Sequence, residues 1–354
     1  MSQPGEASRE LVICLGVPAY QTPPYVEKLA KLDPRIAVVG LPVDPGADWA
    51  SVAPGEPHDE PPVWGKGVAA ERRAALARAE VLFALHVPKD LMRLAPRLRW
   101  VQGMGAGVEQ LAKAGIERSR VVVTNASGVS AGSMAEFVIG RLLQVWKRFR
   151  EADAHQRAHA YVRTYGRTVA GATLGIVGMG SIGCAVAARA RALGMRVLGL
   201  RRSAAPGANP EPAHELFGPE RLHELLGRSD AVVVAAPETP ETRHLIDAAA
   251  LAALKPGALL LNVARGALVD EAALIEALAS GRLGAAALDV FDPEPLPPES
   301  PLWELPNVYV SAHSSVSVDR YLDDVFDLFA ENVARFVRGE PLRNRVDMEA
   351  LGFR

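Results

Sequence analysis

Short apolar runs alternate with helical stretches along most of the chain, which is the pattern of parallel β-sheets covered by helices. A first series of strands is predicted at residues 11–15, 36–40, 81–85, 98–102 and 121–124. A second series is predicted at residues 174–177, 197–200, 231–235, 259–263 and 285–288. The runs of the second series are apolar on both faces, as central strands of a parallel sheet usually are. The pattern therefore predicts an α/β fold with two doubly wound parallel sheets.

Helical spacing marks several connections between these strands. Helices are predicted at about residues 25–32, 70–79 and 133–150, the last of them leading from the first α/β unit into the second. Apolar residues that recur every three or four positions from Val318 to Phe336 predict a final helix, which stops at Gly339 and packs back on the first unit. Residues 42–67 are dense in Pro, Gly, Asp and Glu and are predicted to form a long surface loop.

The size and charge of the chain limit the classes of function that fit it. At 354 residues, the chain is longer than a single core usually fills, so two domains are expected. The 39 basic and 41 acidic residues give a net charge of −2, which provides no general attraction for nucleic acid or for an anionic membrane. An anionic ligand therefore has to be held by a local site.

Cysteine usage and the amino-terminal segment indicate the compartment. The two cysteines, Cys14 and Cys184, have neither a CxxC nor a zinc-type spacing, so neither a disulfide framework nor a metal site is predicted. The first ten residues are polar, and no apolar run approaches the ~18 residues that a membrane span requires. We expect a soluble, unprocessed protein of the cytoplasm.

A glycine fingerprint, Gly178-Met179-Gly180-Ser181-Ile182-Gly183, follows the predicted strand 174–177 and opens an alanine-rich helix. Gly178 permits the tight turn, Gly180 leaves room for a pyrophosphate, and Gly183 lets helix and strand approach closely. The N–H groups at the start of the helix then face the phosphates of a dinucleotide. The alternative is a plain strand-to-helix turn, but the strand and helix on either side favour a dinucleotide site.

The next strand ends in Leu200-Arg201-Arg202-Ser203, where a site for NAD would usually place an acidic residue on the ribose 2′-hydroxyl. A carboxylate there would repel a 2′-phosphate, whereas two guanidinium groups and a hydroxyl would bind it through charge-assisted hydrogen bonds. Arg201, Arg202 and Ser203 therefore predict NADPH (NADP) as the favoured cofactor over NADH (NAD). A solvated strand end stays open as an alternative, because the sequence does not show where these side chains point.

Two polar residues at later strand ends suit hydride transfer to a keto acid. Arg265 follows strand 259–263, at the carboxyl end of the sheet where ligands of open α/β folds bind. Its planar guanidinium suits a substrate carboxylate and can polarise the carbonyl group. Asp289 ends the next strand and is placed to meet the nicotinamide carboxamide.

A carboxylate and an imidazole complete the candidate chemistry. Glu294 lies between two prolines, which restrict the backbone around it. His313 follows the strand-like residues 308–311. A lone histidine is more often structural, but after Arg265 and Glu294 at successive strand ends it is the natural proton donor. Because a neighbouring carboxylate orients an imidazole and favours its protonated form, Glu294 and His313 are predicted to form an acid/base pair.

With these residues in place, the chain resembles the D-isomer-specific 2-hydroxyacid dehydrogenases. The segments that carry the resemblance are 96–111 (PRLRWVQGMGAGVEQL), 121–137 (VVVTNASGVSAGSMAEF), 174–183 (LGIVGMGSIG), 237–247 (PETPETRHLID), 261–278 (LNVARGALVDEAALIEAL), 288–297 (LDVFDPEPLP) and 300–315 (SPLWELPNVYVSAHSS). The resemblance implies a flavodoxin-like substrate-binding domain, residues 1–127 and 316–354, in which a dinucleotide-binding Rossmann domain, residues 128–315, is inserted.

The resemblance also implies residue roles. Arg265 binds the keto acid, Glu294 and His313 are the acid/base dyad, and Asp289 contacts the nicotinamide. The turn Gly105-Ala106-Gly107 binds the substrate carboxylate through its N–H groups. Further cofactor contacts are implied at Ala236, Pro237, Thr242, Val263, Ala264 and Ser315. The helix that begins near Ser133 is implied to form a homodimer.

Two departures from the family pattern bear on the predicted reaction. The chain has Ser311-Ala312 where Thr-Pro usually precedes the histidine, and this leaves the strand end less rigid. Arg201 and Arg202 replace the acidic residue of NAD-preferring members. The arginine pair and the Gly-Ala-Gly-Val turn look most like glyoxylate/hydroxypyruvate reductases, so we predict reduction of a small 2-keto acid to the D-2-hydroxy acid.

Two other functions stay open. A cofactor-gated binding protein resembling transcriptional co-repressors would keep the fold, although the chain has no basic or low-complexity tail for such work. Oxidation of formate or phosphite would need a different lining around Arg265. The particular acid is not predicted, because candidate specificity residues of the first domain suit packing equally well, namely Trp49, Trp64, His86 and Met104.

Overall fold

A computed structural model describes residues 9–42, 70–88, 90–108, 111, 116, 120–202, 211–317 and 319–348. The chain divides into two compact units, Met1–Val129 with Val318–Arg354, and Ser130–Ser317. These boundaries lie two residues beyond the predicted boundaries at 127 and 315. Each unit has its own parallel sheet, so the predicted α/β fold with two parallel sheets is confirmed.

The first unit is built on five parallel strands in the order β2-β1-β3-β4-β5. The strands are β1 (Leu11–Leu15), β2 (Ile36–Gly40), β3 (Val81–Ala84), β4 (Trp100–Gly103) and β5 (Val122–Thr124). Among the described residues of this unit, the α-helices are α1 (Pro23–Ala30), α2 (Ala70–Arg78), α3 (Leu91–Leu94) and α11 (Tyr321–Arg338).

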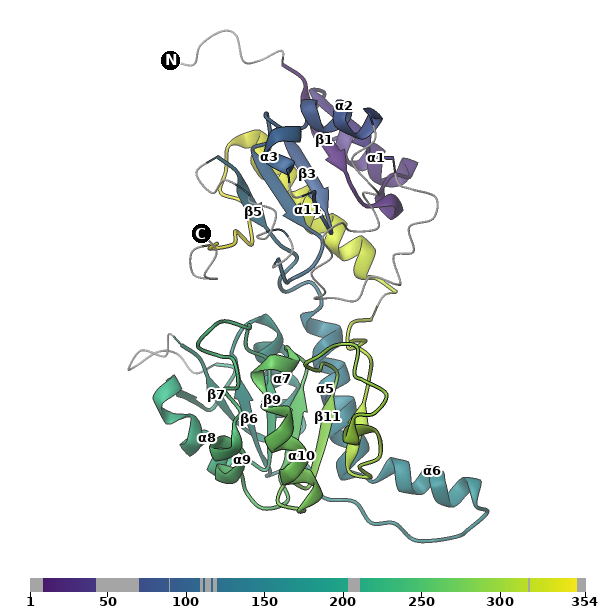
Figure 1. Cartoon of the computed structure of the whole chain (residues 1–354), viewed down its shortest axis with the longest axis vertical. Coiled ribbons are helices and arrows are strands. Elements are labelled where there is room, and N and C mark those ends of the chain that lie inside the picture. The colour runs from purple at the N-terminus through teal and green to yellow at the C-terminus, as the bar shows by residue number, and fades with distance from the viewer. Residues whose placement is uncertain are drawn as a thin grey trace. The chain divides into compact units, whose positions relative to one another are not determined.

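Helix α11, yellow in Figure 1, returns the end of the chain to the sheet of the first unit. Its buried aromatic residues face the strands: the ring of Phe329 stacks on Phe83 with centroids 4.6 Å apart and contacts Trp100 at 5.3 Å. The helix ends at Gly339, whose φ of 68° is readily adopted only without a side chain. The predicted final helix, its end and its packing are confirmed.

The second unit is built on seven parallel strands in the order β12-β11-β10-β9-β6-β7-β8. The strands are β6 (Thr173–Val177), β7 (Arg196–Leu200), β8 (Glu215–Phe217), β9 (Ala231–Val234), β10 (Leu259–Asn262), β11 (Ala285–Leu288) and β12 (Val308–Val310). The helices are α5 (Ala131–Trp146), α6 (Phe149–Arg157), α7 (Ser181–Ala192), α8 (Leu222–Arg228), α9 (Ala248–Ala253) and α10 (Glu271–Ala279). Two apolar cores, one on each face of the sheet, hold helices and strands together. The elements of this unit are labelled in Figure 1.

The prediction of one helix over residues 133–150 is wrong, because the helix is interrupted. Helix α5 ends at Trp146, and Arg148 has a left-handed φ of 59° before α6 begins. The carbonyl of Trp146 accepts a hydrogen bond from the N–H of Arg167 at 2.7 Å, and the guanidinium of Arg167 lies 4.3 Å from the Trp146 ring. The end of α5 is therefore held by Arg167, where a continuous helix would have supplied the hydrogen bond from the next turn.

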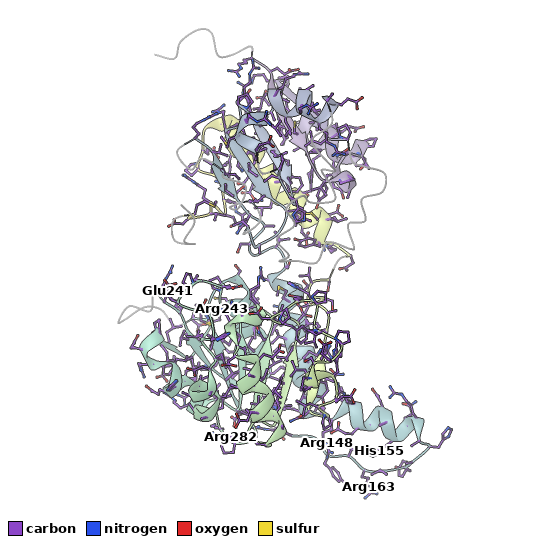
Figure 2. The ribbon with its side chains drawn as sticks, in the orientation of Figure 1. Arg148, His155, Arg163, Glu241, Arg243 and Arg282 are labelled. Atoms are coloured by element: carbon purple, nitrogen blue, oxygen red, sulfur yellow. The ribbon has the colours of Figure 1, made fainter. Side chains whose placement is uncertain are left out.

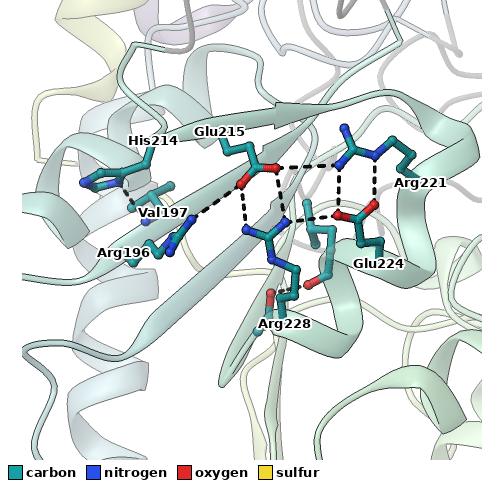
Figure 3. Close-up of polar contacts among 9 residues, drawn as sticks. Arg196, Val197, His214, Glu215, Arg221, Glu224 and Arg228 are labelled. Carbon is teal, nitrogen blue, oxygen red and sulfur yellow. Dashed lines mark hydrogen bonds and ion pairs between the residues drawn. The ribbon is translucent and has the colours of Figure 1, made fainter.

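Strand β8 extends the sheet beyond the predicted strands. It has only three residues, of which Phe217 alone is buried, so no run of apolar residues marks it in the sequence. Its first residue, Glu215, lies within a network of arginine and glutamate side chains (Figure 3). Charged side chains therefore cover this short edge strand.

Some predictions concern residues that the structure does not describe. The predicted loop 42–67 beyond Pro42, the candidate residues Trp49 and Trp64, and Ser203 lie outside the described residues. In the ranges that are described, no helix combines the length and apolar character needed to cross a bilayer. The same ranges contain no group of three or more His, Cys, Asp or Glu side chains placed to hold a metal ion.

Candidate active site

The glycine fingerprint forms the turn between β6 and α7. Gly178 has a φ of 107°, and a Cβ atom there would lie 2.5 Å from the nitrogen of Ala236. A Cβ atom on Gly183 would overlap the carbonyl of Gly178. At Gly180, the N-cap of α7, a Cβ atom would meet no described atom within 4 Å. Two glycines are thus required by packing, and the third leaves open space at a helix N-terminus, which suits a pyrophosphate.

The remaining fingerprint residues support this turn. Met179 is buried, and its N–H donates to Leu200 O at 3.2 Å, which ties the turn to the end of β7. Ile182 packs against the core on that side of the sheet, and Ser181 is exposed as the first residue of α7. The exposed start of α7 therefore presents N–H groups rather than apolar side chains.

The end of β7 carries two guanidinium groups. Arg201 is half-buried, and its Nε is a buried donor without a hydrogen-bond partner. Arg202 is exposed. The pKa of Glu241 is lowered, first by the hydrogen bond between Glu241 and Thr239 and also by the charge of Arg202. Neither arginine is in an ion pair with another described residue. Both cations are therefore available to an anion at this strand end.

The end of β9 leads into a hydrogen-bonded turn. Ala236 lies directly against Gly178 of the fingerprint. The hydroxyl of Thr242 donates to Pro237 O at 2.8 Å and accepts from the N–H of Thr239 at 2.7 Å. The three predicted contacts Ala236, Pro237 and Thr242 are therefore parts of a single turn next to the fingerprint.

Asn262, the last residue of β10, shapes the segment that carries Arg265. Its Oδ1 accepts from the N–H of Ala264 at 3.0 Å, and its Nδ2 donates to Arg265 O at 2.9 Å. Val263 and Ala264 are buried, whereas Arg265 is partly exposed and donates from Nη1 to Ala264 O at 2.7 Å. The predicted contact residues therefore follow one another in a fixed strand-end turn.

Asp289 organises the segment that contains the histidine. Its side chain is 1 % exposed and accepts from the Ser311 hydroxyl at 2.7 Å. It also accepts from the N–H groups of Ser314 at 2.9 Å and Ser315 at 3.0 Å. The Asp289 carbonyl accepts from the N–H of His313 at 2.8 Å. One residue at the end of β11 thus fixes the whole turn after β12.

His313 lies 3.0 Å from Glu294, measured between Nδ1 and Oε1. Both side chains are partly exposed, at 28 % and 18 %. The φ of His313 is 46°, a left-handed conformation that costs about 1–3 kcal/mol in a residue with a side chain and persists only where neighbouring contacts enforce it. The hydrogen bonds to Asp289 supply that enforcement. An imidazole with Nδ1 on a carboxylate presents Nε2 to a reacting group.

Arg265 belongs to a neighbouring segment of the same sheet edge. Gly266 packs so closely on the backbone of Phe291 that a Cβ atom on it would overlap Phe291. The segment after β10 therefore contacts the segment that leads to Glu294. Among the described side chains, the guanidinium of Arg265 makes no hydrogen bond or ion pair with Glu294 or His313. The structure brings carboxylate and imidazole into contact and places the arginine one strand away from Asp289.

The turn Gly105-Ala106-Gly107 lies in the first unit, one residue after the end of β4. Ala106 is exposed, and the other two residues are partly exposed. In the part of the chain that the structure describes, no acceptor meets the N–H groups of these three residues. The turn therefore offers unpaired backbone donors of the kind that bind an anion.

The sequence-based prediction did not include two residues that hold the candidate site. Asn262 and Ser311 hold the segments of Arg265 and His313. The role of Asn262 could have been predicted, because the side-chain amide of an asparagine at a strand end can form hydrogen bonds with the backbone of the next few residues. The N–H donors of Ser314 and Ser315 have no such signal, because every residue except proline carries one.

Comparisons with known proteins identify the family of the chain. The model of the D-isomer specific 2-hydroxyacid dehydrogenase NAD-binding domain matches residues 139–315. A glyoxylate reductase of Korarchaeum cryptofilum is 33 % identical over 316 residues, which are 84 % of this chain and 93 % of that protein. A D-3-phosphoglycerate dehydrogenase of Mycobacterium leprae is 37 % identical over 281 residues, which are 78 % of this chain but 52 % of that protein. The chain thus spans about half the length of the phosphoglycerate dehydrogenases it matches.

A solved structure with a bound cofactor is similar over nearly its whole length. It is an NADPH-dependent glyoxylate/hydroxypyruvate reductase of Sinorhizobium meliloti in complex with NADP and sulfate, 29 % identical with a TM-score of 0.74, and the match covers 97 % of this chain and 99 % of that one. The chain belongs to the D-isomer-specific 2-hydroxyacid dehydrogenases, a family of NAD(P)-dependent oxidoreductases that act on the CH–OH group of hydroxy acids.

Proposed function

We propose that the protein reduces a small 2-keto acid, of the glyoxylate or hydroxypyruvate kind, to the D-2-hydroxy acid with NADPH. The observation that carries the proposal is the contact of His313 with Glu294 in a turn that Asp289 holds. An imidazole fixed in this way is suited to deliver a proton to a carbonyl oxygen. The names of the Korarchaeum and Sinorhizobium relatives support this substrate class.

Each group of the site has one task in this reaction. When bound, the cofactor supplies the hydride. In the first unit, the N–H groups of residues 105–107 are suited to bind a carboxylate. In the second unit, the guanidinium of Arg265 is suited to bind the substrate and to orient its keto group. His313 gives its proton from Nε2 to the carbonyl oxygen, while Glu294 keeps the ring in place through Nδ1. Positioned proton transfer contributes about 10²–10⁴ in rate, and alignment of the two reactants contributes more.

The cofactor site fits a dinucleotide, and its polar groups favour the phosphorylated form. The open space at Gly180 and the helix start at Ser181 suit the pyrophosphate. The buried, unpartnered Nε of Arg201 and the unpaired charge of Arg202 would be satisfied by a 2′-phosphate. An NADPH-dependent enzyme among the similar structures supports the same preference.

Steady-state kinetics with a panel of substrates test the proposed function. We expect glyoxylate or hydroxypyruvate to be reduced with a higher kcat/KM for NADPH than for NADH. A preference for NADH would remove the role assigned to Arg201 and Arg202. Turnover of formate or phosphite in place of the keto acids would replace the proposed reaction. Absence of any turnover, with tight NADPH binding, would favour a cofactor-gated binding protein.

Homodimer formation is also part of the proposal. The segment after α5 forms an arm whose two ends are tied by the hydrogen bond from Arg167 to Trp146 (Figure 2 labels His155 and Arg163 on it). No residue of α6 is buried, and the arm exposes Tyr161 at 98 % and Tyr165 at 76 %. A short helix without buried side chains is marginal in water, which supports a second copy of the chain as its partner.

Sedimentation measurements test the role of the arm. The protein is expected to sediment as a dimer, and the double variant Tyr161→Ser/Tyr165→Ser is expected to dissociate at micromolar concentration. Trp303→Ser removes an aromatic side chain that is 48 % exposed elsewhere on the unit and serves as the matched control. A double variant that stays as dimeric as wild type would contradict the arm as the interface.

A further inference from the structure

Three successive carbonyl groups, those of residues 104–106, are each held by a separate donor. The hydroxyl of Tyr321 donates to the first at 2.9 Å, the N–H of Ala126 to the second at 2.9 Å, and Nδ2 of Asn125 to the third at 2.7 Å. Asn125 and Ala126 follow β5, and Tyr321 is the first residue of α11. Two segments far apart in the sequence thus hold the same turn.

Holding a carbonyl group also fixes the N–H group of the next residue. The peptide unit is planar and trans, so its C=O and N–H bonds point in opposite directions. The three held carbonyls of residues 104–106 therefore turn the N–H groups of residues 105–107 the other way. These are the N–H groups that no acceptor meets within the described residues.

We infer that Tyr321 and Asn125 are positioning residues, which orient the backbone N–H groups of residues 105–107 to bind the carboxylate of the substrate. The inference rests on the proposed function for that turn and adds the side chains that shape it. Neither side chain is assigned a contact with the substrate, because each acts through a backbone carbonyl.

The neighbours of both side chains favour the assigned donor roles. Oδ1 of Asn125 accepts from the N–H of Ser127 at 3.1 Å, so the other end of the amide, Nδ2, is the end that meets the turn. The backbone of Asn125 exchanges hydrogen bonds with Asn344, which fixes its position. Burial raises the pKa of Tyr321, so its hydroxyl stays protonated and remains a donor at neutral pH.

Binding of oxalate to the full chain with NADPH, measured by isothermal titration calorimetry, tests the inference without requiring turnover. Oxalate carries the carboxylate but is not reduced. Tyr321→Phe removes only the hydroxyl, and loss of one hydrogen bond predicts about 3- to 10-fold weaker oxalate binding. The Kd of NADPH should not change. In kinetics, KM of the keto acid should rise by the same factor while kcat stays within about two-fold.

Tyr20→Phe is the matched control for this variant. Tyr20 is fully buried, and its hydroxyl donates to Leu322 O of the same helix at 3.0 Å without touching the turn. The control should lose thermal stability to a similar extent and keep the wild-type Kd for oxalate. An unchanged Kd in Tyr321→Phe, an equal weakening in Tyr20→Phe, or no oxalate binding by the wild type would overturn the inference.

A second pair of variants examines the amide. Asn125→Ala should also weaken oxalate binding about 3- to 10-fold. Asn307→Ala, which removes an amide that donates to Leu278 O in the other unit, should not. Wild-type protein that fails to reduce keto acids while its oxalate binding depends on Tyr321 would contradict the proposed function and support the inference. If the wild type reduces keto acids, but Tyr321→Phe and Asn125→Ala bind oxalate with the wild-type Kd, the proposed function is supported and the inference is contradicted.

Discussion

The two ends of the seven-stranded sheet hold their charged side chains in different ways. At the amino ends of the strands, Glu215 lies 2.6 to 3.6 Å from three arginines, Arg196, Arg221 and Arg228 (Figure 3). Hydrogen bonding by Arg228 is the main cause that lowers the pKa of Glu215. The charges at this end are therefore neutralised within the protein.

The carboxyl ends of the strands leave several cations unpaired. Asp289 is satisfied by a hydroxyl and two backbone N–H groups, not by a guanidinium within ion-pair distance. Arg201, Arg202 and Arg265 are in no ion pair with any residue that the structure describes. One arginine at this end, Arg243, pairs with Asp292 at 3.0 Å and with Glu238 at 3.6 Å. Asp289 and Glu294 instead hold the backbone and the imidazole, and the three unpaired cations stay available for anionic groups.

This difference separates charges that pair within the protein from charges that we propose to bind ligands. Exposed ion pairs each contribute little to stability, because water and salt screen them and ordering the side chains costs entropy. A buried carboxylate that satisfies backbone donors has a larger effect, since its loss leaves those donors without partners. Substitutions at the two ends of the sheet should therefore differ in size and in kind.

The largest expected effect is at Asp289. Asp289→Ala leaves the N–H groups of Ser314 and of the buried Ser315 without their acceptor, which should lower the free energy of unfolding by about 2–4 kcal/mol. Displacement of His313 should lower kcat by about 10²-fold. Denaturant titration and steady-state kinetics measure the two quantities.

Asp230→Ala is the control at the other end of the same sheet. Asp230 also accepts a backbone N–H, from Thr173 at 2.8 Å, and pairs with Arg167 and Lys255. Its loss should lower stability and leave kcat near the wild-type value. Equal losses of kcat in both variants would remove the distinction between the two ends.

A smaller effect is expected at Glu215. Because its folded pKa lies below the unfolded value of about 4.3, the carboxylate stabilises the fold above that pH, and the contribution is lost as pH falls through the folded pKa. Glu215→Gln should lower the free energy of unfolding at pH 7 by less than about 1 kcal/mol, and the difference should shrink in acid and in high salt. If Glu215→Gln lowers the free energy of unfolding by more than about 2 kcal/mol at pH 7 in high salt, Glu215 is not part of an exposed network that salt screens.

Much of the fold was predictable because the signals are local. Runs such as 231–234 and 259–262 are apolar on both faces, and that property marks a buried parallel strand. Strand β8 has one buried side chain and therefore no such run. The break at Arg148 coincides with a hydrogen bond from Arg167 to Trp146, the last residue of α5, and periodicity within the helix does not report a contact with so distant a residue.

The site was predictable to the extent that strand ends determine it. Parallel strands end at the same edge, so Arg265, Asp289 and His313 were expected on neighbouring segments, and β10, β11 and β12 are neighbours in the sheet. The hydrogen bonds from Ser314 and Ser315 to Asp289 were not predictable, because backbone donors leave no pattern in the sequence. The roles of all these residues in binding and catalysis remain predictions.

The central claim is that His313 delivers the proton to the keto acid. The most direct measurement is kcat for glyoxylate reduction by His313→Ala, together with the Kd of NADPH for the same variant. We predict that kcat falls by about 10²–10⁴-fold while the Kd changes less than about two-fold. Wild-type kcat in the variant, or a loss of activity that follows entirely from weaker NADPH binding, would contradict the claim.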